Sequence, residues 1–138
     1  MLGIHSKQKT IESFEIVSLR TFGMRYAAEY EIVMNTNQAE VSEYGIIFRQ
    51  GKDERRLERR AVVGEGEILN LLNACKVLSW DGFHGKHPAG VKDGTMFSFK
   101  ATVNGGKTVC ADGSQNFPKH YRDFTDALNK MLALGEET

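Results

Sequence analysis

The chain has 138 residues, of which 41% are hydrophobic and 26% are charged, and its 18 basic and 18 acidic side chains give a formal net charge of zero. These values are typical of one globular domain spanning residues 1–138, with a core that requires neither a disulfide nor a metal. The balanced charge argues against a nucleic-acid partner, because nucleic-acid-binding domains usually carry a basic excess. No segment has the apolar length of a signal peptide or a membrane-spanning helix, so we expect a soluble, cytoplasmic protein with no membrane partner.

The first half of the chain predicts four strands joined by short turns, after a polar and flexible lead-in over residues 1–10. The strands are expected over residues 11–20, 26–34, 41–50 and 57–63. The second strand has the clearest pattern, because Tyr30 and Ile32 alternate with charged neighbours, as in a half-buried antiparallel strand. In the third strand, Tyr44, Ile46 and Phe48 are expected to share one face.

The second half changes to helical spacing and then returns to strands. One helical face is formed by Ile68, Leu71, Leu72, Cys75 and Leu78. A strand over 96–103, a hairpin turn at Asn104-Gly105-Gly106 and a return strand over 107–111 follow. Pro118 is expected to begin the last helix and Gly135 to end it. The apolar stripe of this helix is predicted to consist of Tyr121, Phe124, Leu128, Met131 and Leu132. The order ββββ-α-ββ-α predicts an α+β fold in which an antiparallel sheet of about six strands carries both helices on one face.

Two groups of reactive or charged side chains have simple structural explanations. Cys75 and Cys110 are too few for a disulfide framework, and both are interpreted as small buried hydrophobes. The arginines at 55, 56, 59 and 60 could contact phosphates, but they alternate with glutamates and have no aromatic residues among them. A solvated strand whose charges pair across the sheet is the favoured interpretation. We predict no cofactor and no catalytic residue.

The glycine-punctuated segment from Trp80 to Pro118 holds the candidate site. Its first loop contains Asp81, His84, His87 and Asp93, residue types that could ligate a metal or exchange protons, although Asp-Gly pairs are also what turns require. Trp80 could stack on a ligand, but burial in the core is the favoured interpretation. The Gly113–Pro118 turn leaves the same hairpin and would bring Asn116 and His120 close to that loop.

Loops on a rigid scaffold commonly carry function, so the two segments together predict a binding surface. Its residues are Trp80, Asp81, His84, His87, Asp93, Asn116 and His120. The favoured hypothesis is a non-enzymatic binding or interaction module for a protein or small-molecule ligand. The alternative is a small metal-dependent or hydrolytic enzyme that uses His84, His87 and Asp93. A third hypothesis is a homodimer formed through an exposed sheet face or edge.

Three motifs follow one another in the second half of the chain. They are Trp80-Asp81-Gly82, then Val91, Asp93, Gly94 and Thr95 with Phe97, then Gly113-Ser114 with Phe117-Pro118. In this order they resemble a group of small uncharacterised bacterial α+β domains, classed as a domain of unknown function, with the motifs Trp-Asp-Gly, Val-x-Asp-Gly-Thr-x-Trp and Gly-Ser-Asn-x-Tyr-Pro. Phe97, Gln115 and Phe117 depart from that pattern. The resemblance covers about residues 65–134 and implies a fold but no activity.

Overall fold

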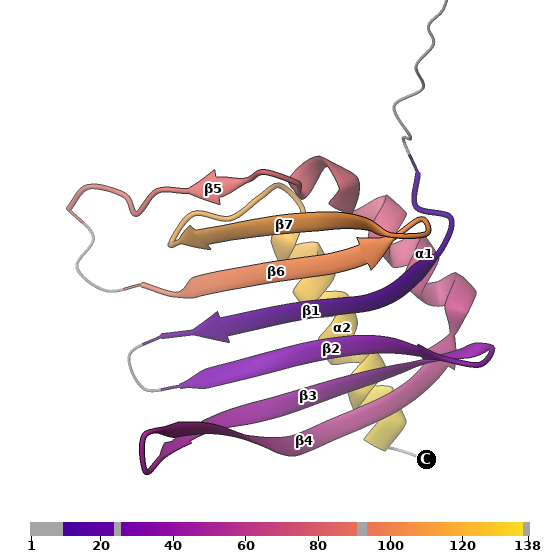
Figure 1. Ribbon diagram of the computed structural model, residues 1–138, viewed down its shortest axis with the longest axis horizontal. Coiled ribbons are helices and arrows are strands. Elements are labelled where there is room, and N and C mark those ends of the chain that lie inside the picture. The colour runs from indigo at the N-terminus through magenta and orange to yellow at the C-terminus, as the bar shows by residue number, and fades with distance from the viewer. Residues whose placement is uncertain (1–9, 24–25, 91–93, 137–138) are drawn as a thin grey trace, which may run out of the picture.

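The computed structural model describes residues 10–23, 26–90 and 94–136. It has an α+β fold in which one twisted sheet carries its helices on a single face (Figure 1). The elements in chain order are β1 (Phe14–Phe22), β2 (Ala27–Asn35), β3 (Gln38–Arg49), β4 (Lys52–Gly64), α1 (Glu65–Ala74), the 3₁₀ helix η1 (Val77–Trp80), β5 (His84–Gly85), β6 (Met96–Val103), β7 (Lys107–Ser114) and α2 (Tyr121–Glu136). The predicted flexible lead-in falls almost entirely outside the described residues.

The sheet has seven strands in the order β4-β3-β2-β1-β6-β7-β5. The prediction of six antiparallel strands is therefore wrong in number and order, although the α+β class and the mostly antiparallel pairing are confirmed. The additional strand, β5, pairs parallel with β7 through His84 opposite Asp112 and Gly85 opposite Gly113. A strand of two residues cannot produce a period-two pattern, so the sequence indicated only a loop there.

Strand β1 joins the two halves of the sheet. It pairs antiparallel with β2 on one side and with β6 on the other, where Leu19 lies opposite Phe99. The side-chain oxygen of Asn104 accepts from the N–H of Glu12 at 2.7 Å, which secures the chain that leads into β1 to the β6–β7 turn. The pairing of β1 with β6 thus makes one sheet of the meander and the hairpin, and the Asn104 bond supports it from outside the ladder.

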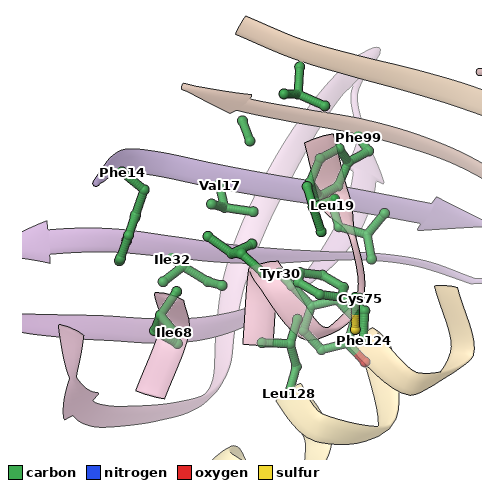
Figure 2. Close-up of a cluster of buried hydrophobic side chains, with 14 of the residues drawn as sticks. Phe14, Val17, Leu19, Tyr30, Ile32, Ile68, Cys75, Phe99, Phe124 and Leu128 are labelled. Carbon is green, nitrogen blue, oxygen red and sulfur yellow. The ribbon is translucent and has the colours of Figure 1, made fainter. Parts of the chain in front are cut away.

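The core lies between the sheet and the helices (Figure 2). Alternate residues of the central strands point toward it, because side chains alternate between the two faces of a strand. Leu19, Ile32 and Phe99 from the sheet meet side chains from both helices. The helical contribution comes from Ile68, Leu72, Phe124, Leu128 and Leu132. The helical stripes predicted from the sequence are therefore the buried ones.

Three helix boundaries differ from the prediction. Helix α1 ends at Ala74, because Lys76 takes a left-handed conformation with φ of 53° and the chain continues as η1. Pro118 lies in the turn before α2, where its carbonyl accepts from the N–H of Tyr121 at 3.1 Å. Gly135 does not end α2, since it lies within the last turn.

The face of the sheet opposite the helices carries the large side chains that the sequence placed together on one face of the third strand. Tyr44, Ile46 and Phe48 do share one face of β3, but it is this open face, and Phe48 is 73% exposed. The buried residues of β3 are the smaller Ala39 and Val41. The sequence did not indicate which face the helices cover, and the larger side chains stay uncovered because β3 is next to the edge of the sheet and the helices cover only the other end of this strand.

The two cysteines lie in different environments. Cys75 is buried, and desolvation, assisted by the nearby Asp123 carboxylate, raises the pKa of its thiol. Cys110 is exposed on β7, so the prediction that both are buried is wrong for this residue. It lies opposite Lys100, on the open face of the sheet, where the period-two alternation of β7 places it.

Replacing Gly135 tests how closely α2 approaches β4. A Cβ atom at this position would lie 2.6 Å from the Cβ of Ala61 and 3.0 Å from the carbonyl oxygen of Arg60, so Gly135→Val forces the helix away from the strand. We expect the free energy of unfolding to fall by about 1–3 kcal/mol in urea denaturation. Gly66→Val is the matched control, because nothing lies within 4 Å of a Cβ there. A silent Gly135→Val would contradict this packing.

Candidate functional site

The two segments that the sequence singled out lie side by side in the structure. Besides the β5–β7 pairing, the side-chain amide of Asn116 donates to the carbonyl of Lys86 at 3.4 Å. Nδ1 of His87 and the hydroxyl of Ser114 are 2.8 Å apart. The loop that follows η1 therefore packs along the outer side of β7 and against the turn that leaves it.

Two glycines permit this close approach. A Cβ atom on Gly85 would lie 2.5 Å from the carbonyl oxygen of Asn116, and one on Gly113 would lie 2.2 Å from the same oxygen. The obstacle is backbone in both cases, so it cannot be relieved by a change of side-chain rotamer. The turn after β7 can fold back over the two strands only because both positions lack a side chain.

Trp80 anchors the loop from within the core. It is 1% exposed, and its ring packs edge-on against Phe99 and Phe124 at centroid distances of 4.9 and 5.5 Å. The indole N–H donates to the carbonyl of Lys119 at 3.0 Å. Because Lys119 lies in the connection that leads to α2, this bond ties the end of η1 to the start of α2. The favoured interpretation of Trp80 as a core residue agrees with this position.

The histidines each contact a different partner. His84 contacts the Asp112 carboxylate through Nδ1, and both side chains are exposed. Nδ1 of His120 lies 3.1 Å from a carboxylate oxygen of Asp123, one turn further along the chain. His87 contacts Ser114, as described above. Among the residues that the structure describes, no three His, Cys, Asp or Glu side chains are grouped closely enough to hold a metal ion.

The remaining candidates are Asp81, which has a structural role, and Asp93. The Asp81 carboxylate accepts from the N–H of Cys110 at 3.0 Å and so holds η1 against β7. Asp93 lies outside the described residues, and its predicted role stays a prediction. The binding roles of the other candidates are likewise predictions that no observation tests.

A depression of about 520 Å³ lies beside this region, at the start of α2. It is lined by Thr95, Gln115, Phe117, Pro118, His120, Tyr121, Arg122, Asp123 and Thr125. Among the residues that the structure describes, His120 is the only predicted site residue in that lining. The loop residues His84 and His87 lie on the β5 side of the turn, so the structure divides the predicted surface into a β5 side and a depression.

Aromatic side chains form one wall of the depression. The rings of Phe117 and Tyr121 are stacked, with centroids 4.6 Å apart and an interplanar angle of 27°. Phe97 supports both rings from the core, at 5.4 and 5.0 Å. Burial is the main reason that the pKa of the Tyr121 phenol lies well above its ordinary value. The phenol, which is protonated at neutral pH in any tyrosine, thus keeps its proton at alkaline pH as well and remains a hydrogen-bond donor.

The connection between β7 and α2 is held in place by Thr95. The N–H of Gln115 donates to the carbonyl of Thr95 at 2.8 Å, and the Gln115 side-chain oxygen accepts from the N–H of Thr95 at 2.7 Å. Gln115 and His120 both have positive φ, of 54° and 71°. Such conformations are unfavourable for residues with a side chain and persist where the surroundings hold them. The wall of the depression is thus a constrained segment.

Sequence reasoning missed most of this lining. Phe117 and Tyr121 are four residues apart on either side of Pro118, and Tyr121 was assigned to the apolar stripe of the last helix. The spacing of these two aromatic residues was the feature of the sequence that could have indicated the aromatic wall. Thr95 and Gln115 could not be found in this way, because they meet only through the pairing of β6 with β7.

The arginine run on β4 is engaged with carboxylates. Arg55 lies 3.5 Å from Glu29 and 3.4 Å from Glu31, and its guanidinium stacks over the Tyr44 ring at 4.2 Å. The other three contact Glu58, Glu43 and Glu40, in the order Arg56, Arg59 and Arg60. The favoured interpretation, in which these charges pair across the sheet, agrees with the contacts of three arginines, whereas Arg56 pairs with Glu58 on its own strand.

Comparisons with protein-family models, with curated proteins and with solved structures found no match. The resemblance to small bacterial domains of unknown function therefore stays a prediction. None of the described helices is long and apolar enough to cross a membrane.

Replacing Trp80 tests its role as an anchor. Trp80→Phe removes the bond to Lys119 and leaves unfilled space in the core, so we expect the free energy of unfolding to fall by about 1–3 kcal/mol in chemical denaturation. His84→Ala is the control from the same segment, and it should change that free energy by no more than about 0.5 kcal/mol because its contact with Asp112 is exposed. Equal effects of the two substitutions would contradict the assignment.

Proposed function

We propose that this protein is a non-enzymatic binding module whose ligand site is the depression between Thr95, the β7–α2 connection and the first turns of α2. The observation that carries the proposal is the stacked pair of Phe117 and Tyr121 in a depression of about 520 Å³. Ligand sites commonly combine an apolar or aromatic wall with a few polar groups that fix orientation. The volume is in the range of small-molecule sites.

The aromatic wall favours a flat ligand. An aromatic ring gains most from offset stacking or edge-on contact with another ring. The Phe117 and Tyr121 rings lie in nearly the same orientation and are supported by Phe97, so they present a fixed surface. A fixed surface loses little conformational entropy when a ligand binds. We therefore assign a small planar molecule, such as a heteroaromatic ring, as the class of ligand.

The polar rim favours a ligand of low net charge. Arg122 and Asp123 contribute opposite charges to the lining, and Thr95 and Thr125 contribute hydroxyl groups. The Thr125 hydroxyl donates to the carbonyl of Arg122 at 3.1 Å and keeps its oxygen free to accept a further bond. A strongly anionic ligand would meet the Asp123 carboxylate, and a strongly cationic one the Arg122 guanidinium. Polar substituents on a neutral ring satisfy this rim best.

Binding is favoured over catalysis because the groups capable of proton transfer are divided between two places. His120 and Asp123 line the depression, whereas His87 and Ser114 contact each other next to β5. The alternative of a metal-dependent or hydrolytic enzyme stays open through Asp93, which lies outside the described residues. Metal analysis of the purified protein distinguishes it from a binding module.

The proposal is tested by a ligand-observed NMR screen with indole, pyridine and purine fragments. We expect these fragments to bind in preference to saturated-ring analogues of the same size. In amide spectra, the fragments that bind should shift the resonances of Gln115, Phe117 and Tyr121 more than those of β2 and β3. Aromatic fragments that bind no better than saturated ones, or that shift the β3–β4 hairpin instead, would refute the proposed site.

A matched pair of variants assigns binding to the depression. Thr125→Arg places a long side chain across the lining and should weaken fragment binding at least about tenfold, which corresponds to about 1.4 kcal/mol. Thr108→Arg introduces the same side chain at an exposed position near the start of β7 and should leave binding unchanged. Equal affinities for the two variants would place the fragments elsewhere.

A further inference from the structure

A groove of about 650 Å³ lies at the opposite edge of the sheet, between the end of β4 and the last turns of α2. Its lining includes Ala61, Val62 and Val63 from β4 and Met131 and Leu134 from α2. Two of the large apolar side chains that this protein exposes lie here, with Val62 exposed by 54% and Leu134 by 59%. Val62 borders the edge of β4 from the open face of the sheet, and Leu134 borders it from the face that the helices cover.

The charges along β4 are distributed unevenly. Every residue from Lys52 to Arg60 except Leu57 is charged. A bulge also interrupts β4, because Arg59 and Leu57 pair with consecutive residues of β3 and leave Glu58 unpaired in the ladder. Charges and bulges are the devices by which edge strands avoid pairing with other chains. Neither the charged side chains nor the bulge extends past Arg60, so the segment Ala61–Gly64 lacks both kinds of protection.

Helix α2 extends beyond this unprotected segment. Its last turn packs on Ala61 through Gly135, and its C-terminal end reaches past β4 (Figure 1). Because Leu134 belongs to this overhanging turn and lines the groove, an added strand would have backbone groups of β4 on one side and an apolar helix surface beneath it. This is the geometry that strand addition uses.

We propose that this groove is the interface of a homodimer, in which the Ala61–Gly64 segments of two copies pair antiparallel across a two-fold axis. The axis stands perpendicular to the sheet, so that the open faces of the two copies become continuous. Open-face residues of one copy must then lie opposite open-face residues of the other. The axis therefore has to pass midway between the two copies of one residue. Centring on Val62 places Val62 opposite Val62, Ala61 opposite Val63 and Gly64 opposite Arg60, and it sets no like charges opposite each other.

The charges that border the groove favour a second copy as the occupant. Arg60 precedes Val62 in the chain and Glu67 follows it, and both line the groove. Pairing centred on Val62 places Arg60 of each copy opposite Gly64 of the other, next to the acidic first turn of α1 that holds Glu67. This arginine, which also contacts Glu40 within its own copy, thus lies beside an acidic helix start twice in the dimer, which is the self-complementarity that an isologous interface needs. The two overhanging α2 turns also approach each other at Leu134, and each covers part of the other copy's edge.

Sedimentation measurements from low micromolar to near-millimolar concentration test the proposal. We expect a reversible dimer whose dissociation constant rises at least about tenfold on Val62→Lys or on Leu134→Lys, because each places a charge in the interface. Phe48→Lys is the matched control, since Phe48 is an exposed apolar residue on the open face, opposite the end of β4 that lies far from the groove, and it should leave dimerisation unchanged. A protein that is monomeric throughout, or a dimer that both groove variants leave intact, would overturn the proposal.

Cross-linking tests the register. In an antiparallel pair, opposite Cα atoms lie about 4.5–5.5 Å apart, within the range of about 4.4–6.8 Å that a disulfide spans. In a Cys110→Ser background, which removes the exposed thiol, Val62→Cys should form an intermolecular disulfide under mild oxidation. Leu57→Cys should not, because the same axis places it opposite α1 of the second copy. Cross-linking of Leu57→Cys in place of Val62→Cys would refute the arrangement.

Discussion

The fold depends on the pairing of β1 with β6. These strands lie far apart in the sequence, and their seam is the only contact within the described sheet that joins the N-terminal meander to the C-terminal hairpin. Leu19 and Phe99 meet across it on the buried face, and Phe99 packs in turn on Trp80 and Phe124. Without this seam, neither half would have a complete surface for both helices to cover.

The position of the candidate site follows from that packing. Trp80 fills the space between β6 and α2 and, through its bond to Lys119, fixes where α2 begins. The β7–α2 connection is then confined between Thr95 and the first turn of the helix, and the Phe117 and Tyr121 rings are held against Phe97. The depression is thus a consequence of how the core closes, and the only tryptophan acts by positioning its wall. Groups that are fixed in this way are well suited to binding a rigid ligand.

The sequence predicted the parts that depend on local patterns. The apolar stripe of α2, the alternation in β2 and the bounds of β6 all agree with the structure. It could not predict β5, which has no periodicity of its own and exists because Gly85 and Gly113 let the chain approach β7. The sequence also placed Phe48 on one face of β3 with Tyr44 and Ile46, but it did not indicate that the helices leave this face uncovered. For the site, composition identified the histidines, but tertiary pairing placed His120 beside Phe117 and separated it from His84.

The central claim, that the β1–β6 seam unites the chain in one cooperative unit, is tested most directly by native-state hydrogen exchange. Amides at the seam, such as those of Leu19 and Phe99, should exchange only through global unfolding, as should the indole N–H of Trp80. Buried amides of β2 and β3 should give the same free energy of opening as those of β6 and β7. Two separate free energies, with the meander opening while the hairpin and α2 remain protected, would contradict the account.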